Sequence, residues 1–216
     1  MLKAVIFDLN GTVLEDEYIY GRAFRKVLAY LGRKIDKGYP QIGGVGVEEN
    51  WPRLISKYHI KTQRPYEELA RMTQEAYLSN ISKVKVKPGF KDLIKNLRKE
   101  NIKCALATSN TWWMVNRIFE KINLKEYFDV VTTKEEVAFN KPSPDIFLKT
   151  ADKLDVGYDE CVVIEDSEAG IEAAKAAGMK VIALIKDNRD KNNIIKLADL
   201  AVNNFKEITP AGLKLI

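Results

Sequence analysis

The sequence is poor in the residues that build disulfide frameworks and histidine-rich metal centres. Its 216 residues include two cysteines and one histidine. Cys104 and Cys161 lie far apart inside apolar runs, where they resemble small core residues, so a reducing, cytoplasmic setting is expected. His59 stands alone, which excludes a metal site built from several histidines.

Long hydrophobic runs are also missing. No apolar stretch approaches the roughly 20 residues that span a bilayer. The N-terminal apolar run is interrupted at once by Asp8, so we expect no signal peptide and no membrane association. The hydrophobic share of 46% and the charged share of 30% are those of a globular protein, which excludes intrinsic disorder.

The positive charge is concentrated in one part of the chain. The formal net charge is +5, and residues 15–87 carry the whole surplus, with 14 Lys and Arg against 9 Asp and Glu. A solvated helical face is the simplest interpretation, and attraction of an anionic small molecule is the alternative. No dense basic block with interleaved aromatics occurs, so a nucleic-acid partner is not expected.

Buried strands and amphipathic helices alternate along most of the chain. This order predicts an α/β fold with a three-layer, Rossmann-like core around a parallel sheet. The expected strands are continuous apolar runs at Ala4–Phe7, Ile102–Thr108, Val130–Thr132, Cys161–Ile164 and Val181–Leu184. The expected helices between them cover Phe90–Glu100, Trp112–Ile122, Pro144–Leu154 and Ser167–Ala177.

Residues 15–87 break this alternation. They contain no buried-strand run but three helical patterns, at Tyr18–Tyr30, Glu48–Tyr58 and Pro65–Ser79. We therefore expect a core of residues 1–14 and 88–216 and an inserted, all-helical cap of residues 15–87. A glycine-rich connection at Gly38–Val47 is expected to be a mobile loop whose tip reaches back over the core.

Polar residues follow the expected strands where each strand ends. Ligands of open parallel sheets bind beyond these carboxyl ends, so the groups are expected to converge on one crevice. Acids and hydroxyls there suit a hard cation, with Mg²⁺ favoured, and a lysine suits a phosphoryl group. One carboxylate would be able to attack phosphorus. The segments concerned are Asp8–Thr12, Thr108-Ser109-Asn110, Asn140–Pro144 and Glu165-Asp166-Ser167.

In order and spacing, these segments resemble the four motifs of the haloacid dehalogenase superfamily, over nearly the whole chain. The helical insertion resembles the cap of the subgroup that contains phosphoglycolate phosphatases and β-phosphoglucomutases. The resemblance implies that Asp8 is the nucleophile and that Lys141 binds phosphate and screens Asp8.

The same resemblance implies the remaining site residues. Phosphate or substrate is expected at Thr108, Ser109, Asn110 and, from the glycine-rich loop, Gly44. Mg²⁺ is expected on Asp8, Asp166 and the backbone carbonyl of Asn10, with Glu165 as a further ligand or a supporting acid. The implied partner is a small phosphorylated metabolite, and the implied assembly is a monomer or a homodimer.

Asn10 departs from the pattern. Phosphatases of the family have aspartate two residues after the nucleophile, where it protonates the leaving oxygen and then activates water. An asparagine cannot move that proton, and such assistance is typically worth about 10²–10⁴-fold. The expected phosphatase is therefore slow or stalls as phospho-Asp8. The asparagine is either natural or introduced to trap a complex.

Two other functions stay open. The first is a sugar-phosphate mutase similar to β-phosphoglucomutase, although Tyr20 stands where mutases have a cap histidine. Their Gly-x-Ser-Arg stretch is replaced by Gly44-Val45-Gly46-Val47, which lacks an arginine for a second phosphate. The second is a catalytically retired domain that binds a phosphorylated ligand. The acid pair Glu165-Asp166 argues against haloacid dehalogenation, which needs no metal.

Overall fold

A computed structural model describes residues 1–185 and 191–216 of the chain. Its main sheet has six strands, all parallel, in the order β5-β4-β1-β6-β7-β8. The strands are β1 (Ala4–Phe7), β4 (Lys103–Thr108), β5 (Val130–Thr133), β6 (Cys161–Glu165), β7 (Lys180–Leu184) and β8 (Leu200–Val202). The predicted α/β core with a parallel sheet is thus confirmed.

Strand β1 lies at the centre of the sheet, between β4 and β6. Its four residues are fully buried, and alternate side chains enter the two faces of the sheet. Val5 and Phe7 belong to one hydrophobic cluster, while Ala4 and Ile6 belong to the other. An apolar strand covered on both faces is what the continuous run predicts.

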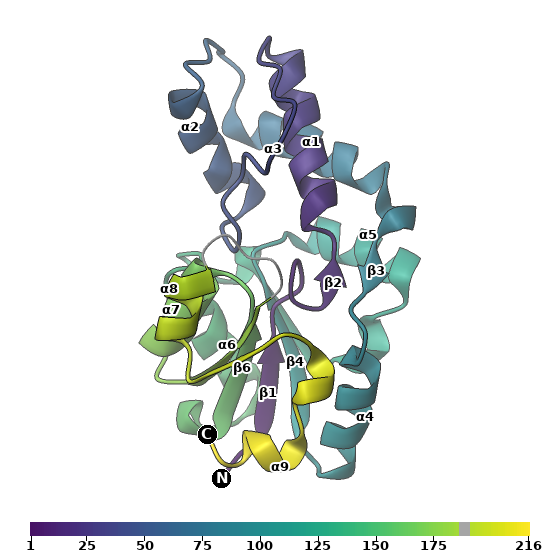
Figure 1. Cartoon of the computed structure of the whole chain (residues 1–216), viewed down its shortest axis with the longest axis vertical. Coiled ribbons are helices and arrows are strands. Elements are labelled where there is room, and N and C mark those ends of the chain that lie inside the picture. The colour runs from purple at the N-terminus through teal and green to yellow at the C-terminus, as the bar shows by residue number, and fades with distance from the viewer. Residues whose placement is uncertain (186–190) are drawn as a thin grey trace.

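Helices cover both faces of the sheet and make the three layers (Figure 1). On the Phe7 face lie α4 (Phe90–Lys99) and α5 (Trp112–Ile122), with η5 (Phe205–Glu207) and the short α9 (Pro210–Leu213) near the C-terminus. On the opposite face lie α6 (Asp145–Leu154) and α7 (Glu168–Ala176), with α8 (Lys191–Leu197) beside α7. Each of the four predicted core helices forms, with its ends shifted by at most one residue.

The insertion consists of α1 (Glu17–Tyr30), α2 (Val47–Lys57) and α3 (Tyr66–Leu78), which pack on one another above the strand ends (Figure 1). Phe24, Trp51, Leu54, Leu69 and Tyr77 are buried among them. Each such side chain contributes roughly 1.5–3 kcal/mol of hydrophobic stabilisation. Among the described residues, no strand of the main sheet falls within 15–87.

The chain leaves and re-enters the core through a two-stranded antiparallel sheet. Its strands are β2 (Leu14–Glu15) and β3 (Lys85–Val86), and Leu14 pairs with Val86. Neither of these two-residue strands is predicted by the sequence pattern. The pair closes the insertion at its base and brings α1 directly above the end of β1.

No helix in the described part of the chain is long and apolar enough to cross a membrane. Cys104 and Cys161 are buried free thiols, and burial raises the pKa of each to about 12.

Candidate active site

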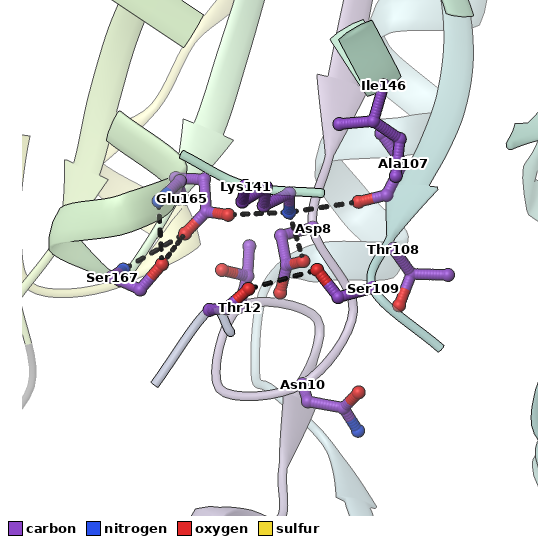
Figure 2. Close-up of polar contacts among 12 residues, drawn as sticks. Asp8, Asn10, Thr12, Ala107, Thr108, Ser109, Lys141, Ile146, Glu165 and Ser167 are labelled. Atoms are coloured by element: carbon purple, nitrogen blue, oxygen red, sulfur yellow. Dashed lines mark hydrogen bonds and ion pairs between the residues drawn. The ribbon is translucent and has the colours of Figure 1, made fainter. Parts of the chain in front are cut away.

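Asp8 is the first residue after β1, and its side chain is buried at the carboxyl end of the sheet. The Lys141 ammonium lies beneath it, with Nζ 2.6 Å from Asp8 Oδ1 and 2.7 Å from Glu165 Oε1. The same ammonium donates to the Ala107 carbonyl at 3.2 Å (Figure 2). All three donor positions of the ammonium are therefore occupied.

Burial and charge oppose each other in this cluster. Burial raises the pKa of the Asp8 carboxyl to about 7, although the Lys141 ammonium acts in the other direction. Burial by itself would lower the pKa of Lys141, but Asp8 and Glu165 outweigh it and hold the pKa above its usual value. Lys141 therefore stays charged and serves as a fixed positive group below the nucleophile candidate.

Glu165 ends β6 and is fully buried. Its Oε1 accepts from Lys141, and its Oε2 accepts from the backbone amides of Asp166 and Ser167 and from the Ser167 hydroxyl, each at 2.9 Å. Four hydrogen bonds thus satisfy this carboxylate. They fix Lys141 and the turn that leads into α7.

Asp166 lies beside Asp8 at the same edge of the sheet. Asp8, Glu165 and Asp166 each offer a carboxylate oxygen within 4.8 Å of the others. Burial, and next the Glu165 charge, raise the pKa of Asp166 well above its usual value. The Thr12 hydroxyl donates to Asp166 Oδ1 at 2.7 Å. Three carboxylates held this close outnumber the single Lys141 ammonium beside them, so a hard divalent ion at Asp8 and Asp166 would offset the remaining charge.

A cavity of about 440 Å³ opens above these groups. It is lined by Asp8, Asn10 and Asp166 and by the end of β4 and the residues after it, Thr108, Ser109 and Asn110. Lys141 and Glu165 lie beneath the floor. The structure therefore brings together all the core residues that the sequence analysis singled out.

The glycine-rich loop supplies the opposite wall. Gly44 lines the cavity, and its carbonyl accepts from the Ser109 hydroxyl at 2.9 Å, so the predicted reach of this loop to the core is confirmed. Asn50 on α2 anchors this loop. Its Oδ1 accepts from the Ile42 amide, and its Nδ2 donates to the carbonyls of Ile42, Val45 and Gly46.

Aromatic and aliphatic side chains line the rest of the cavity, among them Tyr20, Phe24, Tyr39, Ile42 and Val47. Lys57 is the one Lys or Arg among its described lining residues, and Glu17 and Glu168 add two acids. This part of the cavity suits an uncharged organic group better than a second anion.

The sequence patterns give no sign of three residues of this site, Asn50, Asp16 and Tyr77. Asn50 gives no signal, because a buried asparagine within a helix looks like any polar residue. Asp16 stands out by no motif. It occupies the N-cap position of α1, yet its side chain makes no capping bond. It is instead buried beneath Asn10, in contact with Tyr77 from α3. Such contacts across the insertion have no local pattern.

Comparison with known proteins identifies the family. A family model described as a haloacid dehalogenase-like hydrolase matches residues 2–178. A phosphorylated carbohydrates phosphatase of Thermotoga maritima is 30% identical over 96% of this chain and 96% of its own. A β-phosphoglucomutase of Bacillus subtilis is also 30% identical, over 96% of this chain and 92% of its own.

Solved structures give the same result. CbbY from Rhodobacter sphaeroides, in a mutant form with asparagine in place of an aspartate and in complex with xylulose-(1,5)bisphosphate, superposes with a TM-score of 0.86. It is 30% identical, with 99% of each chain covered. A β-phosphoglucomutase from Clostridium difficile gives a TM-score of 0.86 at 26% identity, covering 100% of this chain and 96% of that one. On its four motifs, its fold and these relatives, the chain belongs to the haloacid dehalogenase-like hydrolases.

Proposed function

We propose that the chain is a Mg²⁺-dependent phosphatase that hydrolyses a small phosphomonoester through a phospho-aspartate at Asp8. The observation that carries the proposal is the setting of Asp8. Its carboxylate lines the cavity while Lys141 contacts it from behind at 2.6 Å. A carboxylate held against a fixed ammonium and open on one side is suited to attack an incoming phosphorus atom.

The donor set supports Mg²⁺ as the cation. Asp8, Asp166 and the Asn10 backbone carbonyl would hold it, and all are oxygen ligands of the kind that Mg²⁺ prefers. We assign Glu165 to holding Lys141 rather than to the ion, because its oxygens already accept four hydrogen bonds. When bound, Mg²⁺ would supply positive charge beside the phosphoryl oxygens and Asp8.

In the proposed first step, an Asp8 oxygen attacks phosphorus and the bond from phosphorus to the ester oxygen breaks. Thr108 lines the cavity and would contact the phosphoryl oxygens, while Lys141 would stabilise them through its charge from behind Asp8, and the leaving group departs toward the insertion. In the second step, water attacks phosphorus and the bond from phosphorus to Asp8 breaks. Inorganic phosphate leaves and the carboxylate is restored.

Asn10 limits both steps in this proposal. Its carboxamide neither gives a proton to the leaving oxygen nor takes one from the attacking water. An aryl phosphate, whose leaving oxide needs no proton, should therefore react faster than an alkyl phosphate. Phospho-Asp8 should accumulate.

A phosphorylated carbohydrate or polyol is the proposed substrate class, since relatives are named for such compounds. A phosphatase is favoured over a mutase because Tyr20 has no imidazole and Lys57 is the single Lys or Arg in the described lining. The free, buried thiols Cys104 and Cys161 suit a cytoplasmic enzyme, and a monomer or homodimer is proposed.

The test is a burst experiment with an aryl phosphate and Mg²⁺. We expect an initial burst of aryl oxide, slow steady turnover, and a hydroxylamine-labile phosphate on the acid-quenched protein. Asp8→Asn should remove the burst and lower turnover by at least about 10³-fold while leaving the fold intact. Turnover that survives Asp8→Asn would refute the assignment. Conversion of a hexose 1-phosphate into its 6-phosphate would favour the mutase.

A further inference from the structure

Asp16 is a fully buried acid for which the proposed mechanism has no use. Its Oδ1 accepts from the Gly11 amide at 3.1 Å. Its Oδ2 accepts from Asn10 Nδ2 at 2.5 Å and from the Tyr77 hydroxyl at 2.6 Å. Each partner is a donor, so Asp16 sits in a pocket built entirely for an acceptor.

The Asn10 side chain is held from both ends. Its Nδ2 donates to Asp16, and its Oδ1 accepts from Asn110 Nδ2 at 2.5 Å. Asn110 Oδ1 in turn accepts from the Tyr20 hydroxyl at 3.1 Å. Donation therefore runs in one direction, from Tyr20 through both amides to Asp16. In Figure 2 the Asn10 side chain lies apart from the Asp8–Lys141–Glu165 cluster.

The direction of donation restricts which residue fits at position 10. A carboxylate there has no proton to donate, and it would set an acceptor against an acceptor at the 2.5 Å contact with Asp16. Restoring the aspartate that family phosphatases carry would thus create two facing acids. The asparagine at position 10 and the acid at position 16 are therefore complementary, since one donates the hydrogen bond that the other accepts.

We propose that Asn10 and Asp16 form a matched pair, in which Asp16 is the positioning residue that fixes the orientation of the Asn10 carboxamide at the cavity. The consequence is that the two positions must change together. This inference rests on the proposed function for its catalytic part. Its structural part rests only on the hydrogen bonds around Asp16.

An exchange of the two side chains preserves every contact. With Asn10→Asp and Asp16→Asn combined, the new amide at position 16 donates to the new acid at position 10. Its oxygen still accepts from the Gly11 amide, and the Tyr77 hydroxyl turns from donor to acceptor. The new acid keeps the donor from Asn110. The exchange moves the carboxylate to position 10, which lines the cavity.

The test is a double-mutant cycle of the parent, Asn10→Asp, Asp16→Asn and the combined variant, followed by thermal melting. Asn10→Asp should lower the melting temperature by roughly 5–10 °C, the size expected from losing a buried charge-assisted hydrogen bond in a chain of this length. The combined variant should melt within about 2 °C of the parent. Asn123→Asp, at an exposed position, controls for the added charge.

Turnover of an alkyl phosphate with Mg²⁺ is the second readout. The combined variant should exceed the parent by about 10²–10⁴-fold, the usual worth of general acid–base assistance. It should also exceed Asn10→Asp alone by at least about tenfold. A single variant that fails to fold while the combined one folds supports the pairing in its strongest form.

Two results would overturn the inference: a combined variant no more stable than Asn10→Asp, or a single variant as active as the combined one. Failure of the proposed function looks different. In that case the melting temperatures follow the pairing, but no variant hydrolyses any phosphomonoester.

Discussion

The sheet core and the helical insertion contribute different chemistry to one cavity. The core provides the groups that, in the proposed function, act on a phosphoryl group, namely Asp8, Lys141 and Asp166. They come from strand ends and the loop before α6, and each is held by buried contacts. The insertion provides Gly44 and aromatic walls and, through Asp16, the orientation of Asn10. The comparison indicates that the core sets the reaction and the insertion sets fit and orientation.

This division predicts that core substitutions alter metal response and turnover by orders of magnitude. Asp166→Asn keeps the shape of the side chain but removes the charge of a proposed cation ligand. Mg²⁺ at about 100 times its dissociation constant should raise the melting temperature of the parent by roughly 5–10 °C. The variant should lose that rise and most Mg²⁺-dependent turnover. A rise of unchanged size would place the ion elsewhere.

The pH dependence of the stabilisation by Mg²⁺ tests whether Asp8 holds the ion. In the metal-free protein burial raises the pKa of Asp8 to about 7, while an unfolded aspartate stays near 3.8. The folded state thus binds more protons over this interval, and the contribution of Asp8 to stability falls as pH rises. Mg²⁺ needs the carboxylate, so the stabilisation that it brings should grow as pH rises through about 7.

Melting with and without Mg²⁺ at about pH 5.5, 6.5, 7.5 and 8.5 checks this prediction. The difference between the two melting temperatures should be smallest at the lowest pH and should reach a plateau above about pH 8. In Asp166→Asn, the reference variant, the melting temperatures with and without Mg²⁺ should stay equal at every pH. A difference that shrinks with rising pH would contradict the assignment of Asp8 to the ion.

The two regions also differ in how far the sequence could predict them. The core site was predictable because a buried parallel strand is a continuous apolar run, and the residue after it must lie at the ligand-binding edge. Asp8 and Glu165-Asp166 were found in this way. The three-residue β8 was not, because it lies at the sheet edge and is only partly buried, so it leaves little apolar signal. Its neighbour Lys191–Leu197 was missed as well.

The insertion helices were predicted to within one residue, since each carries an amphipathic repeat. Their contacts with the core were not. Asp16, Tyr77 and Asn110 meet from three separate elements, and no local spacing records such a meeting. What the sequence showed at position 10 was a missing acid. The partner that makes the asparagine fit became visible only in the folded chain.

Gly44→Ala should have a smaller effect, and it should fall on substrate affinity. Gly44 has a φ of +73°, and an added Cβ would lie 2.1 Å from Ser167 Oγ. The loop tip must then move away from Ser109 and the cavity. We expect KM to rise about tenfold with kcat within about twofold.

Gly38→Ala is the matched control for that variant. Gly38 also has a positive φ, of +85°, but an added Cβ would meet nothing within 4 Å. The Gly38→Ala variant therefore has the backbone strain of an alanine at positive φ but no clash of the added Cβ with a neighbouring residue. Equal changes in KM for the two glycines would show that strain in the loop, rather than its approach to Ser167, is responsible.

The smallest effect is expected where the two regions meet at the surface. Lys134 of the core lies 2.9 Å from Glu49 and 3.3 Å from Glu48, both on α2. Glu49 also accepts from Asn140, the residue before Lys141, at 2.6 Å. These contacts connect the insertion to the loop that carries Lys141. Half-exposed ion pairs contribute about 0–1 kcal/mol, so Lys134→Ala should raise KM by no more than about fivefold.

The dependence of KM on salt concentration distinguishes the loss of this ion pair from a general effect of removing a positive charge. Exposed ion pairs are screened at high ionic strength, so the KM difference between Lys134→Ala and the parent should narrow toward 1 M NaCl. Lys153→Ala is the matched control, because Lys153 pairs with Glu136 at 2.7 Å entirely within the core. That variant should leave KM unchanged at every salt concentration. If both lysines raised KM alike, the ion pair between the regions would have no part in positioning the insertion.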